Sequence, residues 1–87
     1  MNRIFYRLHT EDRENLPGLV SNYFECYAIY KGIGFWRGIG EHAACIDIIG
    51  AEADVVKVQN LAHCIKSINE QEAVYVTATP TTLFDIR

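Results

Sequence analysis

The clearest alternation of strand and helix patterns lies in HAACIDIIGAEADVVKVQNLAHCIKSINEQEAVYVTAT (residues 42–79). Residues 42–49 and 73–79 are rich in β-forming side chains and are predicted to be strands, the first of them ended by Gly50. Between them, apolar residues recur at the spacing of one helix face, and acidic residues precede them, as helix N-termini prefer. This helical stripe consists of Val55, Val58, Leu61, Ala62, Ile65 and Ile68.

The first half of the chain shows the same order of patterns. Residues 3–9 alternate in polarity and predict a strand, and residues 26–30 predict a second strand. A helix between them is expected to begin near Asn15, because Pro17 is tolerated only in a first helical turn. Its apolar stripe consists of Leu16, Leu19, Val20, Tyr23 and Phe24. The glycine-rich hairpin region, residues 31–41, is expected to be a long hairpin or a bulged extension of the second strand.

These elements predict one ferredoxin-like α+β domain over residues 1–87, in the order βαββαβ. Its four-stranded antiparallel sheet carries both helices on one face. With the strands numbered along the chain, the expected spatial order is 4-1-3-2. Pro80 is expected to end regular pairing of the last strand, because proline cannot donate to a β-ladder.

Strand alternation assigns side chains to the two faces of the sheet. The face under the helices is expected to contain Ile4, Tyr6, Leu8, Ala44, Ile46, Ile48, Val74, Val76 and Ala78. The opposite face is expected to contain Phe5, Arg7, His9, Cys45, Asp47, Ile49, Tyr75, Thr77 and Thr79. Arg7 and Asp47 are expected to pair there. This face is apolar enough to favour an oligomer interface over its alternative, a solvent-exposed sheet with scattered apolar residues.

The amino-acid composition argues against several classes of function. Hydrophobic residues make up 49% and charged residues 22%, which is typical of a globular domain, and the net charge of −3 disfavours nucleic-acid binding. Three cysteines without a CxxC pair predict neither a disulfide framework nor a metal site. We expect no cofactor, no membrane span and a cytoplasmic location. The sequence contains no recognisable nucleophile–base–orienter set, which favours a protein that is not an enzyme.

The glycine-rich hairpin is the main candidate site. Its glycines permit positive φ and close backbone approach, its cations suit a phosphate, and its aromatic rings suit a base. The alternative is a twisted hairpin whose rings pack against a neighbouring subunit. At the end of the first strand, polar residues 10–15 favour helix capping over anion binding. The candidate ligand-binding residues are Lys31, Gly32, Gly34, Phe35, Trp36 and Arg37, with Arg7 and His9 on the first strand.

The chain resembles the PII and CutA-like superfamily. The resemblance rests on the βαββαβ order, on Gly34-Phe35-Trp36-Arg37-Gly38 leading through Glu41 into the third strand, and on Gln71-Glu72-Ala73-Val74 before the fourth. It implies a compact trimer whose sheets enclose the trimer axis, with ligands held in clefts between subunits. The long exposed loop of PII signal transducers and the extended metal-ligand pattern of a copper-tolerance protein are absent from the sequence.

The leading hypothesis is a homo-oligomer, preferably a trimer, that binds a nucleotide or another small anion between subunits. One form of it is a sensor, or a sponge that sequesters a nucleotide signal, as some phage-encoded proteins do. The alternatives are a protein-interaction module that uses the open sheet face and the aromatic hairpin, and a dimeric α+β-barrel enzyme that uses His9 or Asp47. An RNA-binding module with Phe5 as a stacking residue ranks last.

Overall fold

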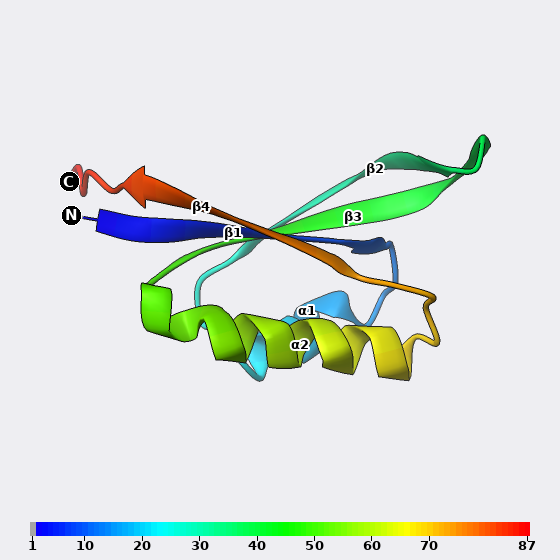
Figure 1. Ribbon diagram of the computed structural model, residues 1–87, viewed down its shortest axis with the longest axis horizontal. Coiled ribbons are helices and arrows are strands. Elements are labelled where there is room, and N and C mark those ends of the chain that lie inside the picture. Colours follow the sequence, from blue (N-terminus) through cyan, green and yellow to red (C-terminus); the bar gives the residue numbers. More distant parts are fainter. Residues whose placement is uncertain (1) are drawn as a thin grey trace.

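A computed structural model describes residues 2–87 and has the predicted βαββαβ architecture (Figure 1). The antiparallel sheet has the order β2-β3-β1-β4, as expected, so β1 and β3 are its central strands. Both helices lie on one face of the sheet (Figure 1). The elements are β1 (Asn2–Glu11), α1 (Leu16–Ser21), β2 (Ala28–Trp36), β3 (Ile39–Gly50), a 3-10 turn η1 (Glu52–Asp54), α2 (Val55–Ile68) and β4 (Tyr75–Thr82).

The hydrophobic core lies between the two central strands and the helices. Alternate residues of β1 and β3 are buried, while their sequence neighbours face the opposite side of the sheet. The hydroxyl of Tyr6 donates a hydrogen bond to the Ala51 carbonyl at 2.7 Å, which satisfies the polar end of this buried ring. Burial and the carboxylates of Asp54 and Glu52 raise the pKa of Tyr6. The core consists of Tyr6, Leu8, Leu16, Val20, Ala44, Ile46, Ile48, Val58, Leu61, Ala62 and Ile65.

The helices depart from the predicted stripes at their ends. Helix α1 ends at Ser21, so Tyr23 and Phe24 follow it, although both still pack against the core. Val55 and Ile68 are the first and last residues of α2, and both are exposed rather than part of its buried stripe. The buried part of the second stripe is confirmed.

The expected capping of α1 by the polar segment is wrong, since no side chain of the described residues caps this helix. Instead, the Glu11 carboxylate binds Arg13 at 2.8 Å, and the Asn15 amide pairs with Asn69. The Asn15–Asn69 pair therefore connects two parts of the fold that are distant in the sequence, whereas the Glu11–Arg13 pair is local.

Strand β4 continues through Pro80, contrary to prediction, and Pro80 lies opposite Ile4 in the ladder. Proline is tolerated there because β4 is an edge strand, whose outer side needs no ladder donor. Val76 and Ala78 pair with Leu8 and Tyr6, as expected for the face under the helices, but both are exposed because β4 is an edge strand.

We expect Leu61→Ala to lower the free energy of unfolding by about 3 kcal/mol, because it opens a cavity in the core. Leu61 is 0% exposed, whereas Val56 on the same helix is 59% exposed. Val56→Ala is the matched control and should change stability by less than about 0.5 kcal/mol. Urea unfolding measures both, and equal effects of the two substitutions would contradict this description of the core.

Candidate functional site

Strands β2 and β3 continue beyond the end of β1 as a two-stranded arm. Glu11 of β1 pairs with Ala43, and the Asp12 amide donates to the His42 carbonyl at 3.1 Å. Residues 33–36 and 39–42 form the ladder of the arm with each other. Arg37 and Gly38 form the turn, with φ of 50° and 79°. Positive φ at both positions is the requirement of a two-residue type I′ turn, whose twist suits a hairpin.

The hairpin glycines were expected to permit positive φ and close backbone approach, and as a group they do so only in part. Within residues 2–87, Gly38 is the one glycine with positive φ, and Arg37 supplies the other left-handed position. Gly32 and Gly34 lie in extended β2 instead. A Cβ on Gly32 would meet no atom within 4 Å, so this position leaves open space beside the backbone. A Cβ on Gly34 would lie 3.2 Å from the Ala43 Cβ, so Gly34 permits a close approach to β3, whereas Gly32 leaves open space.

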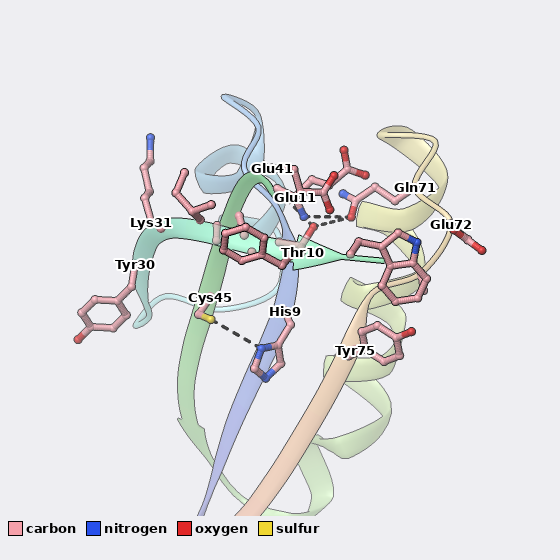
Figure 2. Close-up of a pocket in the computed structure, with 18 residues that line it drawn as sticks. His9, Thr10, Glu11, Tyr30, Lys31, Glu41, Cys45, Gln71, Glu72 and Tyr75 are labelled. Carbon is pink, nitrogen blue, oxygen red and sulfur yellow. Dashed lines mark hydrogen bonds between the residues drawn. The ribbon is translucent and has the colours of Figure 1, made fainter. Parts of the chain in front are cut away.

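A cavity of about 500 Å³ lies at the end of β1, between the arm and the connection from α2 to β4 (Figure 2). Residues of the arm and of β4 line it together, so the arm arches over the end of β1. The lining residues are His9, Thr10, Glu11, Tyr30, Lys31, Gly32, Ile33, Gly34, Phe35, Trp36, Glu41, Ala43, Ala44, Cys45, Gln71, Glu72, Ala73 and Tyr75.

Four cavity residues form one row across the open face of the sheet. Tyr30 of β2 pairs with Cys45 of β3, Cys45 pairs with His9 of β1, and His9 pairs with Tyr75 of β4. The Cys45 sulfur lies 3.7 Å from His9 Nδ1 (Figure 2). A thiol–imidazole pair flanked by two tyrosines therefore lies along one side of the cavity.

Six of the eight predicted site residues line this cavity: His9, Lys31, Gly32, Gly34, Phe35 and Trp36. The two predicted arginines lie elsewhere. The guanidinium of Arg37 stacks on the Trp36 ring, 5.6 Å from its centroid, at the tip of the arm. The guanidinium of Arg7 is bound by Asp47. The cavity thus lacks both arginines that a bound anion was expected to use.

Arg7 and Asp47 form the ion pair predicted for the open face. Arg7 Nε and Nη2 donate to the two Asp47 carboxylate oxygens at 2.6 and 2.7 Å, a bidentate arrangement. The side chains are 39% and 14% exposed. The hydrogen bonds to Asp47 raise the pKa of Arg7 above its usual value. Arg7 is therefore held by the protein itself.

The charges around the cavity are mainly acidic. Lys31 Nζ lies 3.7 Å from an Asp12 carboxylate oxygen, and the Glu11 carboxylate binds Arg13. Glu41 and Glu72 have no basic partner in the described part of the chain. Lys31 is the one lysine in the lining, which contains no arginine from residues 2–87. Aromatic stacking and hydrogen-bond acceptors are consequently what this wall offers a ligand.

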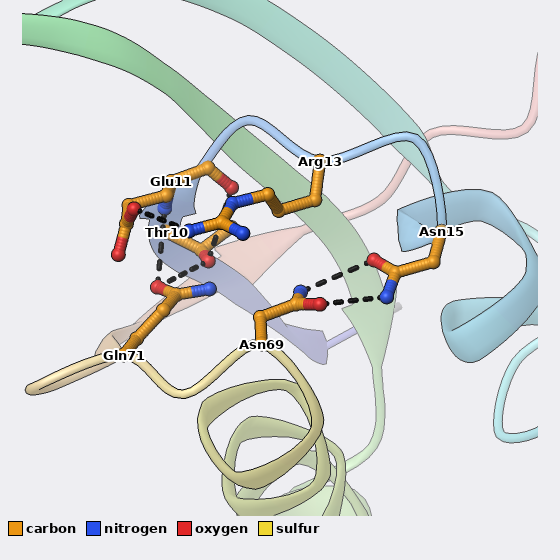
Figure 3. Close-up of polar contacts among 6 residues, drawn as sticks. All are labelled: Thr10, Glu11, Arg13, Asn15, Asn69 and Gln71. Carbon is orange, nitrogen blue, oxygen red and sulfur yellow. Dashed lines mark hydrogen bonds and ion pairs between the residues drawn. The ribbon is translucent and has the colours of Figure 1, made fainter.

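Gln71 ties the connection between α2 and β4 to the end of β1 (Figure 3). Its Oε1 accepts hydrogen bonds from Thr10 Oγ1 at 2.8 Å and from the Glu11 backbone amide at 3.2 Å. The two donors fix the orientation of the amide and leave Nε2 buried, with no acceptor among residues 2–87. Asn15 and Asn69 exchange two further hydrogen bonds, at 2.6 and 3.1 Å. This polar cluster fixes one end of the cavity.

Metal binding has no geometric support in residues 2–87, where no group of three or more His, Cys, Asp and Glu side chains converges. The same residues contain no helix long and apolar enough to cross a membrane.

No family model and no curated protein matches the chain. Solved structures do match. CPII, a nitrogen regulatory PII-like protein from Thiomonas intermedia K12 bound to ADP, AMP and bicarbonate, has a TM-score of 0.69 at 13% identity, over 100% of this chain and 98% of that chain. CutA1 from Oryza sativa has a TM-score of 0.67 at 16% identity, over 98% and 84% of the two chains.

A third solved structure, a phage SAM lyase in complex with S-methyl-5′-thioadenosine, has a TM-score of 0.59 at 16% identity, over 88% of this chain and 80% of that chain. The similarity to PII-like and CutA proteins confirms the predicted resemblance at the level of the fold.

Sequence reasoning missed several cavity residues. Alternation placed His9, Cys45 and Tyr75 on one face, but only the register aligns them in a row. Gln71 marked the entry to the last strand, and no sequence pattern distinguishes a glutamine that ties two elements together. Tyr30 was assigned to a strand and given no role, because the curvature of the arm is a tertiary property.

We expect the Arg7–Asp47 pair to give a favourable coupling free energy that is larger than that of an ordinary surface pair, since it is bidentate and Asp47 is only 14% exposed. The test is a double-mutant cycle with Arg7→Gln and Asp47→Asn, measured by chemical unfolding. An Arg13→Gln and Glu11→Gln cycle is the control and should give less. Additive effects of the first two substitutions would show that the open face does not depend on this pair.

Proposed function

We propose that the protein is a homo-oligomeric small-ligand-binding protein that holds a nucleotide in the cavity under the arm. The observation that supports it most is the aromatic lining, in which four rings from two strands, β2 and β4, line one space: Tyr30, Phe35, Trp36 and Tyr75. A nucleobase stacked on such a ring gains about 1–3 kcal/mol. The cavity volume of about 500 Å³ also lies within the range of small-molecule sites.

The polar groups around the rings suit the rest of a nucleotide. The carboxylates of Glu41 and Glu72 can accept hydrogen bonds from ribose hydroxyls, a common role of acidic residues in nucleotide sites. Lys31 supplies positive charge for a phosphate. Gln71 Nε2, a buried donor without an acceptor in residues 2–87, supports recognition of an acceptor atom on the ligand. The PII-like neighbour bound to ADP and AMP is consistent with this ligand class.

The argument for an oligomer in this proposal is the exposed apolar surface of the chain. Ile49 and Tyr75 are exposed on the open sheet face, and Phe84 and Ile86 in the C-terminal segment are 78% and 90% exposed. Apolar residues exposed in this number on a small subunit are typical of an interface. A neighbouring subunit would then cover this face and add the positive charge that the cavity lacks. The resemblance to PII and CutA proteins favours a trimer.

A second candidate ligand is a positively charged nucleoside, such as an adenosyl sulfonium. The specific observation in its favour is the pair of unneutralised carboxylates, Glu41 and Glu72, beside aromatic rings that attract cations. The phage SAM lyase neighbour, in complex with S-methyl-5′-thioadenosine, is consistent with an adenosine-type ligand.

Calorimetric titration with AMP, adenosine, S-adenosylmethionine and S-adenosylhomocysteine tests the proposal. We expect at least one of these to bind, and Trp36→Ala to weaken that binding by about tenfold, the effect of one lost stacking contact. Val56→Ala, outside the cavity, should leave the affinity unchanged. Tighter binding of AMP than of adenosine would support the nucleotide, and preference for the sulfonium over its neutral homologue would support the second candidate.

No binding of any of these four compounds, or full affinity in Trp36→Ala, would contradict the proposal.

Sedimentation equilibrium tests the oligomer. We expect a mass of about three times the 9.9 kDa subunit, and a shift toward the monomer in Ile49→Glu, because a buried unpaired charge is costly. Glu70→Gln, an exposed change after α2, is the control. A 9.9 kDa species in the unmodified protein at micromolar concentration would overturn the oligomer.

A further inference from the structure

One pair of cavity residues is not used by the proposed binding function. Cys45 and His9 lie on the two central strands, at the same position of the register, with Sγ and Nδ1 3.7 Å apart. This distance allows a hydrogen bond in which the thiol is the donor and the unprotonated ring nitrogen accepts. A nucleophile in contact with a base is the minimal arrangement for nucleophilic activation.

We propose that Cys45 is a nucleophilic thiol, activated by His9 as its general base, that reacts with small hydroperoxides to form a sulfenic acid. Both residues line the cavity and both are half-buried, so a small oxidant can reach the sulfur. Reactive cysteines are found in partly exposed positions beside basic groups, and His9 is such a group next to Cys45.

The groups around Cys45 and His9 favour a sulfenic acid as the product of the reaction, rather than a disulfide within the subunit. Tyr30 and Tyr75 flank the pair, and this row of the sheet contains no carboxylate. The other two cysteines, Cys26 and Cys64, do not line the cavity. A sulfenic acid at Cys45 therefore has no thiol in the same cavity of its own subunit with which to condense.

The step balances without a cofactor. His9 Nδ1 accepts the proton of the Cys45 thiol, and Sγ attacks the terminal oxygen of the hydroperoxide. The S–O bond forms as the O–O bond breaks, and the departing oxygen takes the proton from the His9 imidazolium. Sulfur is oxidised by two electrons, and the hydroperoxide is reduced to an alcohol, or to water in the case of hydrogen peroxide.

The test exposes the reduced full-length protein to hydrogen peroxide with dimedone, which traps sulfenic acids, and quantifies each labelled cysteine by peptide mass spectrometry. Cys26 and Cys64 are internal controls. We expect Cys45 to be labelled at least about tenfold faster than exposed Cys26, and His9→Ala to remove that difference, because general-base assistance contributes this much or more.

Two further variants separate base catalysis from packing. His9→Asn keeps a polar side chain beside the sulfur but cannot accept the proton, and it should react as slowly as His9→Ala. Imidazole added to His9→Ala should restore part of the rate. His63→Ala, which removes the histidine next to Cys64, should leave Cys45 unaffected.

The proposal is overturned if Cys45 is labelled no faster than Cys26, or if His9→Ala, with unchanged circular dichroism, keeps the full rate. Neither result depends on whether a nucleotide binds, so this inference and the proposed function can fail separately.

Discussion

The register between β1 and β3 is the constraint on which the rest of the structure depends. With Leu8 opposite Ile46, the buried residues of both central strands face the helices. The same register sets Arg7 opposite Asp47 and His9 opposite Cys45 on the other face. Because side chains alternate with period two, a slip of one residue would expose the core and bury the ion pair. One register thus determines the core, the ion pair and the floor of the cavity together.

The cavity depends on a second constraint, at the end of β1. The arm continues for four residues on each strand after β1 has stopped, and only the connection from α2 to β4 approaches from the other side. Gln71 holds this connection to Thr10 and Glu11, and the Asn15–Asn69 pair holds the end of α2 to the start of α1. These hydrogen bonds position the wall opposite the arm relative to the end of β1.

The sequence predicted the elements, the strand order and the ion pair, because these follow from periodicity and from pairing of opposite charges. It did not predict the course of β4 through Pro80, since an edge position is a tertiary property. Six of the eight candidate site residues line one cavity, because adjacent residues of one hairpin stay together in any fold. Arg7 and Arg37 lie outside the lining. Asp47 holds Arg7 in the pair that strand alternation predicted, whereas the contact of Arg37 with Trp36 is not revealed by hairpin composition alone.

The absence of Arg7 and Arg37 from the cavity lining links the proposed ligand to the proposed oligomer. One subunit offers rings and carboxylates but a single lysine, which itself lies 3.7 Å from Asp12. A nucleoside is well suited to such a surface, whereas its phosphates need further positive charge. If that charge comes from a neighbouring subunit, the ligand binds the assembled form more tightly than the isolated subunit. Binding and assembly then stabilise each other by mass action, and the ligand concentration would set the amount of oligomer.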